Sequence, residues 1–211
     1  MFKWFWPGLT WTAALTALAL WFGGGRLESD IAGRGGEALA PYIWASFDVD
    51  GRDVTLKGVA PDPGSQTAAR AALANVWGIG AVTDLTSVLP LVSPYVFQIQ
   101  KTGDSLILSG TVPDNDARDR IMAAAEGLNS DGTLDDEMAV GRGSPQAFVE
   151  SVMFALQLAA SLDTGEIKIS DLTISVKGTA LSEARYAALQ SVLGGTLPFD
   201  LKTASVELTG P

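Results

Sequence analysis

Residues 51–62 read GRDVTLKGVAPD, and the pattern returns as GDSLILSGTVPD at residues 103–114 and as SDLTISVKGTALS at residues 170–182. When the inner glycines are aligned, each copy has one aliphatic residue four positions before the glycine and another two positions before it. Apolar residues alternating with polar ones are typical of a strand with one buried face. The sequence therefore predicts three copies of one short unit. The positions that define the unit are Gly51, Val54, Leu56, Gly58, Gly103, Leu106, Leu108, Gly110, Ile174, Val176 and Gly178.

Each copy also has the same neighbours in the sequence. A second alternating stretch and a short turn come before it, which predicts a β-hairpin, and a helix and a last strand come after it. Asp62, Asp114 and Ser182 stand where a helix N-cap is needed, since their side-chain oxygens can accept the first free N–H groups. The preceding strands are predicted at residues 47–49, 95–99 and 167–169, the helices at 63–76, 115–128 and 182–193, and the last strands at 81–88, 134–140 and 201–208.

A further helix is predicted before two of the three hairpins. Residues 145–162 form an amphipathic stretch ahead of the third hairpin. Residues 28–45 precede the first hairpin, but three glycines and Pro41 predict a weak and broken helix there. The second copy has only residues 90–94 in that place, so it lacks this helix. The predicted fold class is α+β, with αββαβ units whose helices lie on one face of a three-stranded mixed sheet.

Small sheets leave unpaired edges, and such edges tend to pair. We therefore expect the three units to pack with approximate symmetry, and the second copy, short of a helix, to lean on a neighbour. The predicted boundaries are residues 1–25 for an amino-terminal segment, followed by units at 26–90, 91–143 and 144–211.

The amino-terminal segment has 22 residues without a charge, at positions 4–25. A helix of that length spans about 33 Å, which is enough to cross a bilayer. Its aromatic residues lie toward the two ends, as is typical of side chains at a membrane interface. We predict a transmembrane helix with Lys3 in the cytoplasm and the remainder in the periplasm, by the positive-inside rule. The predicted membrane-interface residues are Trp4, Trp6, Trp11, Trp21 and Phe22.

A cleaved signal peptide is the alternative interpretation of this segment. Residues 17–19 read ALA, the small-x-small pattern that a signal peptidase requires. Cleavage after Ala19 would leave Leu20, Trp21 and Phe22 exposed at the start of a soluble domain, so we favour the uncleaved anchor. Both interpretations export the rest of the chain.

The composition excludes several classes of chemistry. The chain has no histidine and no cysteine, so a Ser-His-Asp triad, a zinc site with nitrogen or sulfur ligands and a disulfide are all excluded. The formal net charge of −10 argues against nucleic acid as a partner, because phosphate binding requires clustered Lys and Arg. We expect no catalytic residue, no metal site and no cofactor.

Three local patterns contain residue types that could form a site. Ser46, Asp48 and Asp50 approach a calcium loop, but Lys57 stands where the bidentate glutamate is needed. Residues 131–137 hold four carboxylates, which is typical of a solvated loop that enters an edge strand. Trp77 is expected to pack in the core or at an interface, rather than to insert into lipid.

Residues 48–62, with the helix after them and VWGIGAVTD at residues 76–84, resemble the BON domain. The resemblance rests on Gly51, Val54, Leu56 and Gly58 in the hairpin and is weaker in the second and third copies. The layout resembles the front part of alphaproteobacterial OmpA-family envelope proteins, in which a peptidoglycan-binding domain follows. Whether such a domain continues beyond this sequence is left open.

The resemblance implies a cell-envelope protein, because BON domains are associated with phospholipid surfaces and envelope stability rather than with catalysis. We therefore expect a non-catalytic, membrane-anchored periplasmic protein that acts as an interaction or structural module. Two alternatives stay open: an accessory subunit of a larger inner-membrane complex, bound through its tryptophan-rich helix, and a phospholipid-surface binding protein. The expected partner is another envelope or membrane protein.

Overall fold

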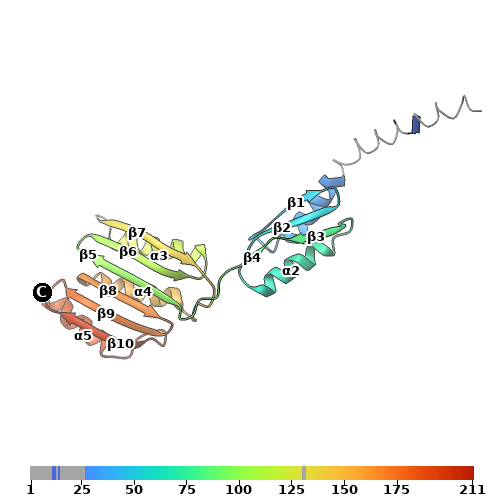
Figure 1. The fold of residues 1–211 in the computed structure, drawn as a ribbon. Helices are drawn as coiled ribbons and strands as arrows, with labels where there is room; N and C mark the ends of the chain where they lie inside the picture. Colours follow the sequence, from blue (N-terminus) through green and yellow to red (C-terminus); the bar gives the residue numbers. More distant parts are fainter. Residues whose placement is uncertain (1–10, 13, 15–26, 130–131) are drawn as a thin grey trace, which may run out of the picture. The chain divides into compact units, whose positions relative to one another are not determined.

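The computed structural model describes residues 11, 12, 14, 27–129 and 132–211, and the chain divides into two compact units with the boundary between Leu89 and Pro90 (Figure 1). The secondary structure is mixed α and β, as predicted. Among the described residues no helix is long and apolar enough to cross a membrane. The predicted transmembrane segment lies almost entirely outside the described residues.

From residue 27 on, the described part of the first unit contains one hairpin, one short parallel extension and two helices. Its strands are β1 (Ala45–Asp50), β2 (Asp53–Ala60), β3 (Ala81–Asp84) and β4 (Ser87–Val88), and its helices are residues 27–39 and α2 (Pro63–Ala74). Strand β2 is central: β1 pairs with it in the antiparallel sense, and β3 and β4 pair with it in the parallel sense. The single strand predicted at residues 81–88 is thus divided in two.

The helix before the first hairpin is continuous, so the prediction of a broken helix is wrong. Residues 27–39 are helical through all three glycines. Gly35 explains part of this, because a Cβ there would lie 3.0 Å from the Phe47 ring and 3.5 Å from Leu73. Burial of Ile31 and Leu39 against the same small core stabilises the helix more than glycine destabilises it.

The second unit is one six-stranded sheet with three helices. In chain order its elements are β5 (Val96–Thr102), β6 (Ser105–Val112), α3 (Asn115–Leu128), β7 (Thr133–Val140), α4 (Phe148–Ala159), β8 (Leu162–Ser170), β9 (Thr173–Ala180), α5 (Glu183–Leu193) and β10 (Lys202–Thr209). The strand order is β10-β9-β8-β5-β6-β7. The second and third copies of the repeat are therefore joined into a single sheet through β5 and β8.

The join between β5 and β8 has an internal two-fold symmetry. Ile99 lies opposite Ile167 across the antiparallel pair. These two residues are equivalent in their own hairpins, since Ile99 lies opposite Leu108 and Ile167 opposite Val176. The same strand of each copy thus provides the partner for the other, which confirms for these two copies that the second leans on a neighbour.

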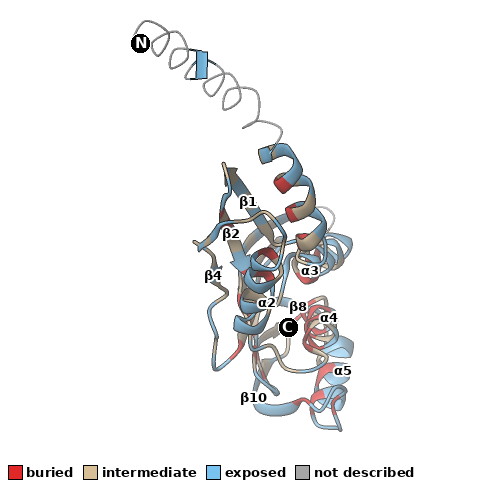
Figure 2. Cartoon of the chain, turned by 90° about the vertical axis from the view of Figure 1, so that its right-hand side faces the viewer, coloured by how far each residue is buried: buried red, intermediate tan, exposed pale blue. Residues whose placement is uncertain are grey.

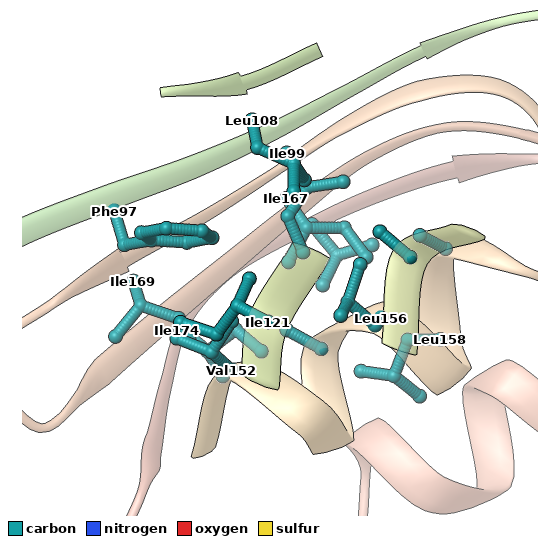
Figure 3. Packing of buried hydrophobic residues seen from close by; sticks show 14 of the residues in the cluster. Phe97, Ile99, Leu108, Ile121, Val152, Leu156, Leu158, Ile167, Ile169 and Ile174 are labelled. Carbon is teal, nitrogen blue, oxygen red and sulfur yellow. The ribbon is translucent and has the colours of Figure 1, made fainter. Parts of the chain in front are cut away.

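Helix α4 covers the join. It packs against α3 of the second copy and against both β5 and β8. Seven of its 12 residues are buried, whereas α5 buries only Leu189 and Leu193. Figure 2 shows this concentration of buried residues along α4, and Figure 3 shows Val152 and Leu156 opposite the isoleucines of the sheet. The helix that the second copy lacks in sequence is therefore supplied by the third.

The inner glycine of each repeat is required by the backbone of the neighbouring strand. Gly58, Gly110 and Gly178 have φ values of 130°, 114° and 156°. A Cβ at these positions would collide with the carbonyl oxygen of Trp44, the residue before β1, or with that of Val96 on β5 or Thr164 on β8. The recurrence of this glycine in the sequence thus reflects a close approach between the two strands of each hairpin.

The three predicted N-caps are confirmed. The side chains of Asp62, Asp114 and Ser182 accept hydrogen bonds from the backbone N–H groups of residues 65, 117 and 185 at 2.9, 2.7 and 3.3 Å. In the third copy Asp171 takes the place of the turn glycine, with φ at 50°. Its carboxylate also accepts the N–H of Tyr95 at 2.8 Å, which ties the start of β5 to the turn after β8.

We expect Gly110→Ala to destabilise the second unit by about 3 kcal/mol or more, because the added Cβ meets backbone that cannot move away. The matched control is Gly103→Ala, where φ is also positive but no described residue lies within 4 Å, and its cost is about 1 kcal/mol. Urea denaturation followed by circular dichroism measures both. Equal losses for the two variants would contradict the close-approach explanation.

Candidate functional site

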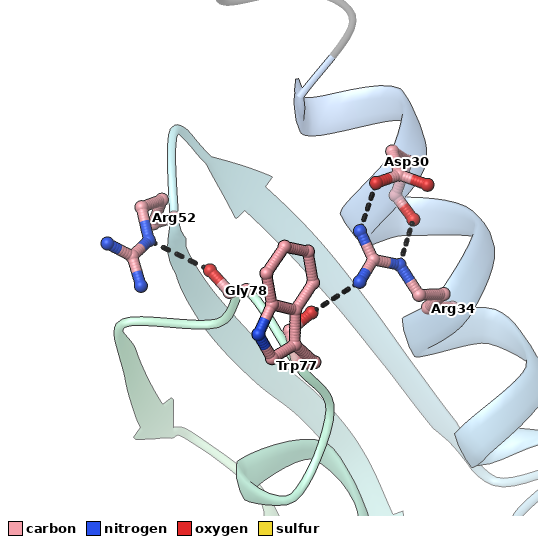
Figure 4. A network of polar contacts seen from close by, with 5 residues as sticks. All are labelled: Asp30, Arg34, Arg52, Trp77 and Gly78. Atoms are coloured by element: carbon pink, nitrogen blue, oxygen red, sulfur yellow. Dashed lines mark hydrogen bonds and ion pairs between the residues drawn. The ribbon is translucent and has the colours of Figure 1, made fainter.

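Among the described residues of the first unit, the most exposed aromatic side chain is that of Trp77, in the loop between α2 and β3. Its side chain is 80% exposed. The guanidinium of Arg34 lies over the indole, 5.0 Å from the ring centroid, and its Nη1 donates to the Trp77 carbonyl oxygen at 2.7 Å. Figure 4 shows these contacts. Trp77 is predicted to pack in the core or at an interface; its exposure excludes the core, and contact at an interface remains a proposal.

Polar contacts fix the loop from two sides. Arg34 also forms an ion pair with Asp30, one turn earlier on the same helix. Arg52, in the turn between β1 and β2, donates from Nε to the Gly78 carbonyl oxygen at 2.9 Å. Gly78 has φ at 102°, which favours glycine and turns the chain sharply after Trp77. These contacts with Arg34, Arg52 and Gly78 hold the indole toward solvent. An indole held in this way is available to contact a partner.

A shallow groove of about 660 Å³ runs beside the indole and is lined by Leu27, Arg52 and residues 74–79. Its apolar lining includes Val76 and Ile79. The two terminal nitrogens of Arg52 make no hydrogen bond to the described part of the chain. An apolar groove next to an oriented cation can accept an acidic group attached to an apolar one. The described residues that line the groove include no Asp or Glu.

Two of the patterns weighed in the sequence are explained by structural contacts. Ser46, Asp48 and Asp50 lie on β1, and Asp48 forms an ion pair with Lys57 on β2. Among the described residues, no group of three or more carboxylates is placed to hold a metal ion.

The acidic run enters β7 and splits between the two faces of the sheet. Asp136 lies on the helix side, where Arg118 donates to it at 2.7 Å, while Asp135 and Glu137 lie on the other face. Burial would raise the pKa of Asp136, but hydrogen bonds from Arg118 and from the Met138 N–H, with the charge of Arg118, lower it below its usual range. Asp131 lies outside the described residues.

The open face of the six-stranded sheet has a row of hydroxyl groups that the sequence analysis missed. All six strands contribute one residue, and each pairs with the next across the sheet. One contact within the row joins the hydroxyls of Thr179 and Thr209 at 3.0 Å. Single serines and threonines give no signal until the strand order is known. The residues are Thr209, Thr179, Thr164, Thr102, Ser105 and Thr133.

The predicted membrane-interface residues are placed in part. Trp11 is helical and 69% exposed, and Trp4, Trp6, Trp21 and Phe22 lie outside the described residues. The apolar residues that define the repeat face the core: Val54 and Leu56 in the first unit, and Leu106, Leu108, Ile174 and Val176 in the second. Gly51 and Gly103 occupy the first position of their turns, with φ at 60° and 56°.

Parts of the first and second copies are similar to a known domain family. The BON domain matches this chain twice, at residues 46–90 and 98–142. The third copy has the same order of elements but lies outside these matches. No curated protein matches the chain.

Two solved structures of CdsD, described as a structural protein of the type III secretion system of Chlamydia trachomatis, are similar over most of their length. The first has 11% identity, covers 86% of this chain and 93% of its own, and has a TM-score of 0.31. The second is the carboxy-terminal domain, with 11% identity, coverage of 85% and 98%, and a TM-score of 0.32. Likeness at this level carries no argument about the chain.

We expect Arg34→Met to loosen the Trp77 loop, because the cation over the indole and the bond to the Trp77 carbonyl are both lost. Amide hydrogen exchange of residues 76–80 should become at least several-fold faster, while the core strands β1 and β2 keep their protection. Arg70→Met on the exposed side of α2 is the matched control and should change neither. An unaltered loop in Arg34→Met would show that Gly78 and Arg52 suffice to hold it.

Asp136→Asn should lower the stability of the second unit at pH 7, and the difference from the native protein should shrink below about pH 4. The pKa of Asp136 is lowered by folding, so its contribution is present above the unfolded pKa and is lost as the pH falls through the folded value. Thermal unfolding between pH 3 and pH 7 measures this. Asp135→Asn on the open face is the control, and a pH-independent loss in Asp136→Asn would contradict the electrostatic cause.

Proposed function

We propose that this chain is a non-catalytic module of the bacterial cell envelope, anchored in the inner membrane by residues 1–25 and extending into the periplasm. Two BON matches carry the proposal, because BON domains are associated with envelope stability and phospholipid surfaces and not with a reaction. We also propose that residues 144–211 are a third, divergent BON-like unit. The repeated hairpin, its inner glycine and its capped helix support this assignment.

The Trp77 groove is the surface proposed to meet a partner. Glu28, near the start of the described helix, accepts the N–H of Gly51 in the β1–β2 turn at 2.9 Å. The first residues of the helix, this turn and the Trp77 loop therefore lie at one end of the first unit (Figure 4). An anchor that ends before residue 27 would hold this end next to the membrane. The fitting partner is thus an envelope protein with an acidic, partly apolar segment close to the bilayer.

Charge favours a protein over a lipid surface as that partner. With Lys3 set aside, 13 basic residues stand against 24 acidic ones, a net charge of −11 on the exported part. An anionic bilayer attracts a protein by about 1 kcal/mol for each nearby Lys or Arg, and it repels an acidic one. Lipid binding without the anchor is therefore disfavoured.

We expect the full chain to fractionate with the inner membrane and residues 27–211 to be degraded by protease added to spheroplasts. The protein should keep the mass of the uncleaved chain, because cleavage after Ala19 would remove the anchor. Recovery of a shortened, soluble periplasmic protein would contradict the anchoring.

Residues 27–211 should not sediment with vesicles of anionic phospholipid at physiological salt, because of their net negative charge. Clear sedimentation that Arg52→Ala abolishes would instead favour the phospholipid-surface function.

Purification of the full chain in mild detergent tests which kind of protein partner it has. Co-purification of one stoichiometric membrane protein that persists in Trp77→Ala would favour an accessory subunit bound through its amino-terminal segment.

A further inference from the structure

Strand β1 of the first unit has an open outer edge. In the described part of the chain β1 pairs with β2 on one side and with no strand on the other. A two-residue turn places Asp50 opposite Asp53, so the peptide groups of Asp50, Asp48 and Ser46 bond to β2. Those of Val49 and Phe47 point away from β2. A short row of backbone donors and acceptors is therefore left for another strand.

The chain itself shows how this edge is filled in its other two copies. Phe47 lies opposite Leu56, two residues before the inner glycine of its hairpin. Ile99 and Ile167 occupy the same place in theirs, and these two lie opposite each other in the join between β5 and β8. In both cases the partner of the strand is a copy of the same strand, antiparallel and in symmetric register. We infer that β1 pairs in the same way with β1 of a second copy of this chain, with Phe47 on the two-fold axis.

Side chains at the edge are compatible with this register. In the second unit Gln98 lies opposite Lys168. The equivalent positions on β1 are 46 and 48, so Ser46 of one copy would lie opposite Asp48 of the other. No two like charges lie directly opposite, because Val49 then faces Ala45. Asp48 is already in an ion pair with Lys57 of its own hairpin, so its charge is balanced on the outer face.

The helix of residues 27–39, which packs over β1, also fits pairing with a second copy. In the second unit one helix, α4, lies over the join, whereas a pair of first units brings two copies of the helix of residues 27–39 to that place. Both fit only if they approach closely, which requires small side chains between them. Helical geometry puts Ala32 and Gly36 on the flank opposite Asp30 and Arg34. Since Arg34 faces the Trp77 loop after α2, the small flank faces the open edge of β1.

Nothing in the described part of the first unit requires a glycine at position 36. A Cβ there would meet nothing within 4 Å, and the residue is exposed with an ordinary helical φ. A glycine inside a helix is unfavourable unless something approaches it. A second copy of the helix provides that approach. Pairing by two-fold symmetry also places the start of each helix at opposite ends of the joined sheet, so the sheet lies along the membrane if both anchors are present.

Cysteine cross-linking tests the register directly, since the chain has no cysteine of its own. Full-length Ser46→Cys is mixed with full-length Asp48→Cys in detergent and oxidised. A covalent dimer should form in the mixture and not in either protein alone, because only the 46–48 pair lies side by side. Thr55→Cys on β2 replaces Asp48→Cys as the control and should give no dimer. Failure of the mixture to cross-link, or equal cross-linking of each protein alone, would overturn the inference.

Gly36→Leu separates this dimer from one formed through the amino-terminal segment. The variant should raise the apparent dissociation constant of the full chain at least tenfold in sedimentation velocity. At a protein concentration where both proteins are monomeric, its unfolding midpoint should not fall, because Leu is the better helix former and has open space among the described residues. Gly33→Ala, also exposed with nothing within 4 Å, is the matched control that should keep the dimer. A dimer unaffected by Gly36→Leu, or a monomer throughout, would reject β1 pairing whatever the protein's location.

Discussion

The antiparallel pairing of β5 with β8 is the constraint on which the second unit depends. Each of these strands has its own hairpin partner on one side, and without the other it would be an open edge. The pairing turns two incomplete three-stranded sheets into one sheet of six. Asp171 strengthens the join, because its carboxylate and its N–H bond to the N–H and the carbonyl of Tyr95.

The number of helices follows from that pairing. Neighbouring strands lie about 4.8 Å apart and helices about 10 Å apart, so one helix covers two strands. Three helices are therefore enough for six strands, and α4 sits where two separate units would each have placed one. This explains why the second copy can lack a helix without exposing its core. Tyr95 and Phe97 close the same core, with both rings set edge-on to Phe148 of α4.

The sequence predicts what local chemistry determines. Alternation, the inner glycines and the N-caps give three hairpins with their helices, since each depends on residues within one copy. Which strand lies next to each hairpin cannot be predicted in this way. Alternation shows which face of a strand is buried, but not which strand pairs with it. The low helix propensity of glycine predicted a broken helix at residues 27–39. The helix is continuous, because packing of Gly35 on Phe47 stabilises it more than the glycines destabilise it. Of the two places predicted for Trp77, the core is excluded, because Gly78 and Arg34 hold the indole outward.

If the pairing of β5 with β8 holds the second unit together, the second and third copies unfold as one cooperative unit. Native-state hydrogen exchange tests this most directly. The amides of Ile99 and Ile167 point across the join between β5 and β8. They should open only with global unfolding of residues 90–211, with the same free energy as the amides of β6 and β9. Exchange of Ile99 and Ile167 at a clearly lower free energy, with each hairpin still protected, would show two separate domains that merely touch.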